Sequence, residues 1–158
     1  MPGARGEKET PPLNAFYGLI FLIVLFDQAS KFLALRLLSA DRSLPVLQGI
    51  FHLTLVHNTG IAFGFFRGHQ TALLLLITLS LIALWAWAVR MENKSSGGQM
   101  AFALILGGAA GNWIDRVRFG AVIDFLDFRV WPVFNIADSA ITMGVVLYFI
   151  LLIKKKKA

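Results

Sequence analysis

Three aspartates interrupt an otherwise apolar stretch near the C-terminal end of the chain. Asp124 and Asp127 lie in AVIDFLDF (121–128), and Asp138 follows in NIADSA (135–140). An apolar environment disfavours the ionised form of a carboxyl group, so each acid must be solvated, paired or neutralised. Two carboxyl groups that meet in such an environment differ in proton affinity, so one can act as a base and the other as an acid. Asp124 and Asp138 are therefore candidates for acid–base chemistry.

Asn135 and Asp138 also have a purely structural interpretation. Asn135 follows Pro132 and precedes an apolar run, so it is well placed to cap a helix, with Asp138 at the third helical position as in a capping box. Capping alone leaves Asp124 unexplained, because that acid lies upstream in a strand-like segment that must return to the same helix end. Both interpretations stay open.

Two charged residues lie inside the first long apolar stretch. Asp27 and Lys31 are four residues apart, so they share one face of a helix, with the acid on the N-terminal side as the better pairing geometry requires. Burying either charge at membrane depth costs free energy. A structural ion pair that fixes this helix against its neighbours is favoured over a direct catalytic role.

A second polar group follows GGAAG (107–111), whose small residues permit close helix packing. Asn112, Asp115 and Arg116 lie at positions i, i+3 and i+4 and therefore project from one helix face. They could face a ligand. The alternative is an Asp–Arg pair that reaches the lipid headgroups.

Asn58 ends the β-branched and aromatic segment FHLTLVHN (51–58) and is followed closely by Gly60. It is either a polar group presented to a ligand or part of a turn, for which Asn and Gly are common. The chain has no cysteine, and its three histidines do not fall at a helical metal spacing. We therefore expect no metal site.

The elements that position these residues are expected to be membrane-spanning helices. Of 158 residues, 57% are hydrophobic and only 15% are charged, and the mean hydropathy is +0.69, which is too apolar for a soluble domain of this size. A helix needs about 20 residues to cross a bilayer. Four stretches qualify, at roughly residues 13–38, 71–89, 100–117 and 136–153. We expect one integral-membrane domain over residues 1–158.

Charge and patterning then orient the chain. Four spans put both termini on one side, and the basic cluster Lys154–Lys157 next to an apolar run indicates the cytoplasmic side, facing anionic lipid, rather than a nucleic-acid partner. The strand-like segments 51–58 and 121–128 then face outward. The predicted fold is an all-α membrane protein of four transmembrane helices with a small extracytoplasmic β-strand element.

Five blocks of this sequence, in this order, resemble the lipoprotein signal peptidases (signal peptidase II), a family of membrane aspartyl peptidases: DQASK (27–31), HNTGIAFG (57–64), GGAAGNWIDR (107–116), VIDF (122–125) and NIADSA (135–140). The resemblance implies an endopeptidase of the bacterial plasma (inner) membrane, with its site near the outer face. Its substrates would be diacylglyceryl-modified prolipoproteins, cut just before the lipidated cysteine. It implies aspartic acid–base hydrolysis without a covalent intermediate, metal or cofactor.

The family pattern also implies residue roles. It selects Asp124 over Asp127 and pairs it with Asp138 as the catalytic acids. It implies four substrate-binding residues, Asn58, Asn112, Arg116 and Asn135. It implies three supporting residues, Asp27, Lys31 and Asp115. We expect a monomer surrounded by membrane lipid.

Two other classes of function stay open beside the peptidase. A small proton-coupled transporter would use intramembrane Asp, Lys and Arg residues as a relay, but most of the polar groups here lie at span ends and in outward loops. A membrane scaffold would use them only for capping and snorkelling. For the peptidase, we further expect a wall of aromatic side chains that binds acyl chains: Phe63, Phe65, Phe66, Phe125 and Trp131.

Overall fold

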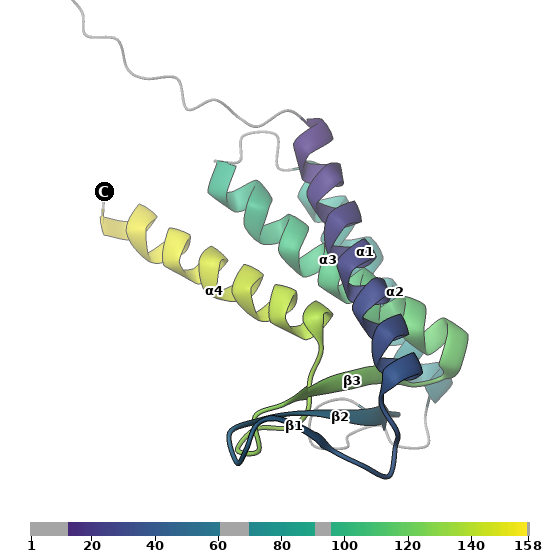
Figure 1. The fold of residues 1–158 in the computed structure, drawn as a ribbon. Helices are drawn as coiled ribbons and strands as arrows, with labels where there is room; N and C mark the ends of the chain where they lie inside the picture. The colour runs from purple at the N-terminus through teal and green to yellow at the C-terminus, as the bar shows by residue number, and fades with distance from the viewer. Residues whose placement is uncertain (1–12, 61–69, 91–95, 158) are drawn as a thin grey trace, which may run out of the picture.

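The computed structural model describes residues 13–60, 70–90 and 96–157. Its elements follow one another along the chain as α1 (Leu13–Leu37), β1 (Leu44–Leu47), β2 (Phe51–Asn58), α2 (Gln70–Arg90), α3 (Ser96–Phe119), β3 (Val122–Asp127) and α4 (Ile136–Lys157). Four long helices run from a small sheet at one end of the molecule (Figure 1). The predicted mostly helical fold with a small β element is confirmed.

Three helices in the described part of the chain are long and apolar enough to cross a membrane, namely α1, α2 and α4, over Asn14–Leu37, Thr71–Arg90 and Ile136–Lys156. The fourth predicted span coincides with α3, which does not meet the same criterion. The composition of α3 explains the difference, because glycines and the polar group at its C-terminal end replace large apolar residues.

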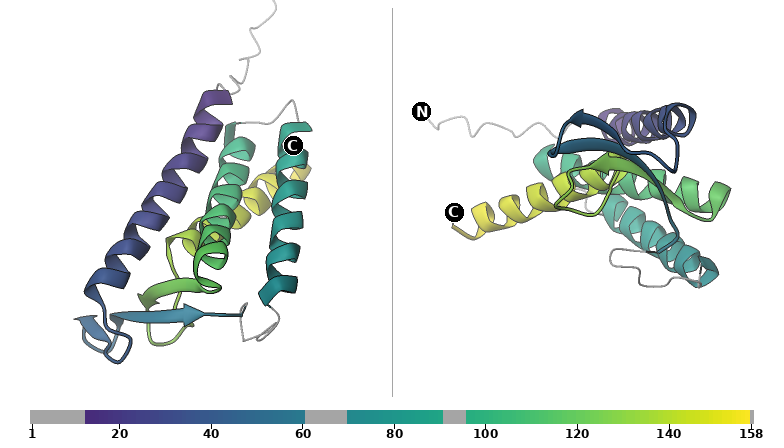
Figure 2. Two further views of the ribbon diagram at one scale, coloured as in Figure 1. Left: turned by 90° about the vertical axis from the view of Figure 1, so that its right-hand side faces the viewer. Right: turned by 60° about the horizontal axis from the view of Figure 1, so that its bottom comes forward.

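The helix α3 is the centre of the helical layer and packs against α1, α2 and α4. The left view of Figure 2 shows it between α1 and α2. Its glycines permit these contacts, as predicted: a Cβ atom at Gly107 would lie 2.9 Å from the Cβ of Ile23, and one at Gly108 would collide with the carbonyl oxygen of Ala137. Close approach of the helices therefore depends on residues that have no side chain.

The sheet has three antiparallel strands in the order β1-β2-β3 and lies across one end of the helices (Figure 2). The segments expected as strands, 51–58 and 121–128, form β2 and β3. The edge strand β1 has no clear sequence signal, because it is short, contains Pro45 and is exposed at every position. In the register, Val56 lies opposite Asp124 and Asn58 opposite Val122.

Candidate active site

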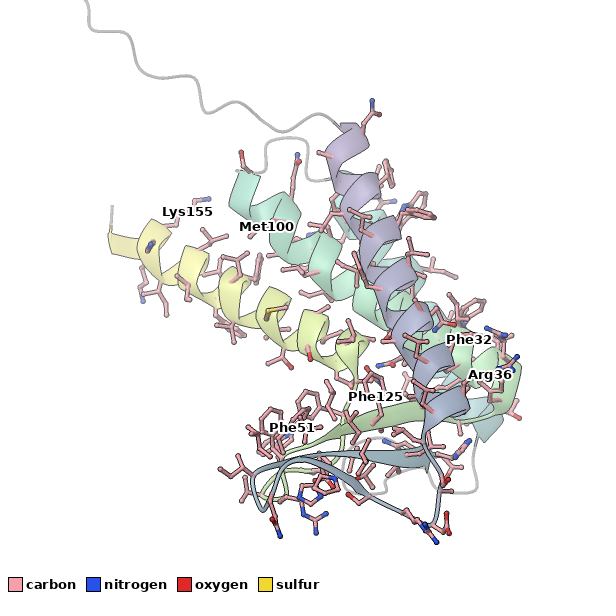
Figure 3. The ribbon with its side chains drawn as sticks, viewed as in Figure 1. Phe32, Arg36, Phe51, Met100, Phe125 and Lys155 are labelled. Atoms are coloured by element: carbon pink, nitrogen blue, oxygen red, sulfur yellow. The ribbon has the colours of Figure 1, made fainter. Side chains whose placement is uncertain are left out.

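Asp124 and Asp138 reach the same region from different elements, β3 and the first turn of α4. Figure 3 shows Phe125, the neighbour of Asp124, where the sheet meets the ends of the helices. Asp124 is only 2% exposed. Its Oδ1 accepts a hydrogen bond from Asn135 Nδ2 (2.7 Å), and its Oδ2 accepts one from Asn58 Nδ2 (3.0 Å). Both oxygens of this acid therefore face carboxamide donors.

Asp138 is held in a comparable way. Its Oδ1 accepts a hydrogen bond from Asn112 Nδ2 at 2.7 Å, and its Oδ2 accepts one from the backbone N–H of Asn135 at 3.3 Å. The backbone N–H of Asp138 in turn donates to Asn135 Oδ1 at 2.9 Å. The predicted capping box is confirmed. Capping uses only one carboxylate oxygen of Asp138, so the other is directed to Asn112.

Asn135 connects the two acids. It is completely buried, and its Nδ2 donates to Asp124 while its backbone N–H donates to Asp138. Its Nδ2 also lies 3.1 Å from Asn112 Oδ1. The amide orientation of Asn135 is fixed because its Oδ1 must accept the backbone N–H of Asp138.

The surroundings of Asp124 favour its protonated form. Burial is the largest cause and raises the pKa of Asp124 from 3.8 to about 7. The negative charge of Asp138 acts in the same direction, and the hydrogen bonds from Asn58 and Asn135 act against it. A carboxyl group with this pKa can hold a proton near neutral pH, as a general acid must.

Asp127 is in a separate hydrogen-bond network. Its Oδ2 accepts from Thr54 Oγ1 (2.7 Å) and Arg129 Nη1 (3.0 Å), and its Oδ1 accepts from the backbone N–H of Arg129 (2.8 Å). Burial alone would raise the pKa of Asp127, but these bonds outweigh it and hold the pKa below the ordinary value. Residues three apart in a strand point to opposite faces, and this sequence signal could have separated Asp127 from Asp124.

A buried charged cluster joins α1 to α3 behind the acids. Lys31 Nζ lies 2.8 Å from Asp27 Oδ2, 2.7 Å from Asp115 Oδ2 and 2.9 Å from Asn112 Oδ1. The predicted Asp27–Lys31 pair is therefore confirmed. Asp27 Oδ1 also accepts the backbone N–H of Ala137 at 2.9 Å, so this acid of α1 helps to cap α4.

Asp115 is not part of an Asp–Arg pair at the headgroups, and that alternative is wrong. Its side chain is buried against Lys31, and its Oδ2 accepts the backbone N–H of Ile123 at 3.1 Å. Arg116 instead donates from Nη2 to the carbonyl oxygen of Gly60 at 2.7 Å. Its buried Nε has no hydrogen-bond partner in the described part of the chain. Arg116 also lines a cleft together with Thr71, Leu74 and Gly120.

Gln28 was not predicted to contribute to the cluster. Its Nε2 donates to Asp115 Oδ1 at 2.9 Å and lies 3.2 Å from the carbonyl oxygen of Gly111. The available signal was its spacing, because Gln28 and Lys31 lie three residues apart and therefore share a helix face.

The expected aromatic wall is described only in part. Phe125 is buried at 7% exposure, and Trp131 is 67% exposed in the segment between β3 and α4. Phe63, Phe65 and Phe66 lie outside the described residues. The acyl-binding role of these side chains stays a prediction.

This chain is similar to one family of known proteins over most of its length. The family model described as signal peptidase (SPase) II matches residues 19–154. The lipoprotein signal peptidase of Halothermothrix orenii is 39% identical over 141 residues, covering 89% of this chain and 97% of the relative. That of Moorella thermoacetica is 43% identical over 133 residues, covering 84% and 88%.

Solved structures show the same similarity. Two, each described as a bacterial membrane enzyme, are 32% identical to this chain. The match to the first has a TM-score of 0.85 and includes 91% of this chain and 90% of the solved chain. The match to the second has a TM-score of 0.84 and includes 94% of this chain and 98% of the solved chain. These similarities and the apolar helices favour a membrane peptidase over a small transporter. The chain belongs to the signal peptidase (SPase) II family.

Proposed function

We propose that this protein is an aspartic endopeptidase that removes signal peptides from diacylglyceryl-modified prolipoproteins, cutting just before the lipidated cysteine. One observation carries the aspartic mechanism: two carboxyl groups from separate elements meet with all four oxygens hydrogen-bonded, and burial favours a proton on one of them. The names of the relatives support the substrate class.

In the proposed mechanism, Asp138 is the base and Asp124 the acid. The N-terminus of α4 stabilises an anion at Asp138. Asp138 takes a proton from water as the water oxygen attacks the scissile carbonyl, and Asp124 gives its proton to the carbonyl oxygen. The resulting diol loses a hydroxyl proton to Asp124, the C–N bond breaks, and Asp138 protonates the leaving amine. Both acids return to their starting states, so no metal or cofactor is required.

The remaining predicted site residues divide by what they contact. Arg116 lines a cleft and has a buried donor that a substrate carbonyl could use. The carboxamides of Asn58, Asn112 and Asn135 face the acids, so their proposed contribution to substrate binding is to orient those acids as the peptide arrives. Asp27, Lys31 and Asp115 support this arrangement from the helices behind it.

We also propose that α3 crosses the membrane as a fourth span. Its position between α1, α2 and α4 supports this, because a helix shielded by its neighbours needs few large apolar side chains of its own. Both termini then lie in the cytoplasm, consistent with the basic end of α4, and the sheet and the acids lie near the outer face of the bacterial plasma membrane. The chain functions as a single domain and a monomer.

Matched Asp→Asn substitutions test the mechanism with purified protein in detergent and a diacylglyceryl-modified precursor peptide. Asp124→Asn and Asp138→Asn keep the size of the side chain but remove a proton-transfer group, so each should slow cleavage about a thousandfold or more. Asp127→Asn is the matched control and should keep most of the activity, because that acid is bound to Thr54 and Arg129. Substantial cleavage by Asp124→Asn or by Asp138→Asn would contradict the proposal.

A further inference from the structure

We propose that Lys31 is a positioning residue for hydrolysis, acting through Asn112 to fix the hydrogen bond that prepares Asp138 as the base. This inference rests on the proposed function. Lys31 Nζ donates to Asn112 Oδ1 at 2.9 Å, and Asn112 Nδ2 donates to Asp138 Oδ1 at 2.7 Å. Lys31 would otherwise be regarded only as the partner of Asp27 in a structural ion pair.

The donors and acceptors leave Asn112 one orientation. An ammonium group has three donors and no acceptor, and those of Lys31 are directed at Asp27, Asp115 and Asn112. Asn112 Oδ1 also accepts from Asn135 Nδ2 at 3.1 Å. Rotating the amide by half a turn would set its N–H against the ammonium group and its oxygen against the carboxylate of Asp138. Lys31 therefore keeps the donor of Asn112 directed at Asp138.

The same cluster also holds the backbone beside Asp138. Asp27, anchored by Lys31, accepts the N–H of Ala137, the residue that precedes Asp138. The side-chain partner and the backbone of the base thus both depend on one lysine. A structural ion pair would need only one carboxylate, and it would not need the third contact to Asn112.

The test must avoid an uncompensated buried charge. Lys31→Met alone leaves two buried carboxylates without a cation to balance their charge and is expected to fail in folding. The neutral triple variant Asp27→Asn/Lys31→Met/Asp115→Asn removes all three charges with side chains of similar size. We expect it to insert and fold, and to cleave the lipidated precursor peptide with kcat about a hundredfold lower and a similar KM.

Thr78→Val is the structural control. It removes a hydrogen bond that fixes α3 to a neighbouring helix, from Trp113 Nε1 to Thr78 Oγ1 at 2.9 Å, and it leaves the contact between Lys31 and Asn112 intact. Its melting temperature should fall, while its kcat and KM stay those of the parent. If the cluster only stabilised the fold, the triple variant and Thr78→Val would lose activity in proportion to stability, and the proposal would be overturned.

Asn112→Asp tests the hydrogen bond between Asn112 and Asp138. It therefore tests the proposal even if the triple variant does not fold. Its carboxylate can still accept from Lys31 but presents a negative charge to Asp138 in place of a donor. We expect loss of kcat with a similar KM, so parental kcat would overturn the proposal. Parental activity of Asp138→Asn would instead contradict the aspartic mechanism itself, which keeps the two failures distinguishable.

Discussion

At the scale of single residues, carboxamides surround the two candidate acids. Asn58 and Asn135 donate to Asp124, and Asn112 donates to Asp138. A carboxamide fixes a carboxyl group by hydrogen bonding without adding a charge, whereas a cation in direct contact would strongly favour the ionised form. Uncharged partners therefore allow the buried Asp124 to keep a proton.

The raised pKa of Asp124 predicts a pH-dependent stability. The folded protein holds this proton more tightly than the unfolded chain, because burial raises the pKa from 3.8 to about 7. The resulting stabilisation is fully present below pH 3.8 and is lost as the pH rises through about 7. Asp124→Asn cannot ionise, so the melting temperature of the parent should fall relative to that of Asp124→Asn across this range.

Melting temperatures of both proteins, measured in the same detergent from pH 5 to about 8, check this expectation. A difference that does not change with pH would show that Asp124 has an ordinary pKa. Asp127→Asn should not reproduce the trend, because the pKa of Asp127 is below the ordinary value in the folded protein.

At the scale of elements, one glycine couples helix packing to the site. A Cβ atom at Gly111 of α3 would lie 2.5 Å from Asp27 Oδ2 and 3.4 Å from the Cβ of Ala137. Gly111→Ala should therefore displace Asp27 from Lys31 and from the start of α4. Overpacking of this kind costs about 1–3 kcal/mol, and we expect a lower melting temperature together with reduced cleavage.

Gly18→Ala in α1 is the control, because a Cβ atom there would meet nothing within 4 Å. Alanine is the better helix former, so this change should be neutral or should stabilise by up to about 1 kcal/mol. Equal melting temperatures for the two alanine variants would mean that α1 and α3 can move apart at Gly111 at little cost.

Sequence patterns predicted elements better than they predicted partners. Long apolar runs and the β-branched segment 51–58 identify helices and β2 because the signal is local. The alternative that paired Asp115 with an arginine at the headgroups was wrong, because a spacing along α3 cannot reveal that the Asp115 side chain turns toward Lys31 on α1. Gln28 was missed for the same reason, since two of its acceptors, Asp115 Oδ1 and the carbonyl oxygen of Gly111, lie on another helix.

At the scale of the whole molecule, the proposed topology sets the two ends of the helical layer on opposite sides of the membrane. Ser43 lies in the segment that leads into the sheet, and Ser96 begins α3 at the other end (Figure 1). The chain has no cysteine, so Ser43→Cys and Ser96→Cys each introduce a single thiol. An impermeant thiol reagent added to intact cells should label the first and reach the second only after lysis. Labelling of both from outside would contradict the single span, α2, that the proposed topology places between them.

The last prediction concerns the lipid on the substrate. Exposed apolar side chains surround the sheet at the proposed outer face, including Leu47 and Ile50 near the β1–β2 turn and Val130 and Trp131 before α4. A buried CH₂ group contributes roughly 0.8 kcal/mol, so two acyl chains could dominate recognition even if the protein and the membrane surface hold only part of their length.

A precursor peptide with an unmodified cysteine should therefore have a much lower kcat/KM than the same peptide with a diacylglyceryl group. The lipid is carried by the residue that follows the scissile bond but does not itself react, so its loss should appear mainly in KM if it only anchors the substrate. The loss should appear in kcat as well if anchoring also aligns the peptide with Asp124 and Asp138. Both peptides are compared in one detergent, with Asp124→Asn as the blank. Equal kcat/KM values would contradict lipid recognition and leave the aspartic mechanism standing, because the acids act on the peptide bond whatever holds it in place.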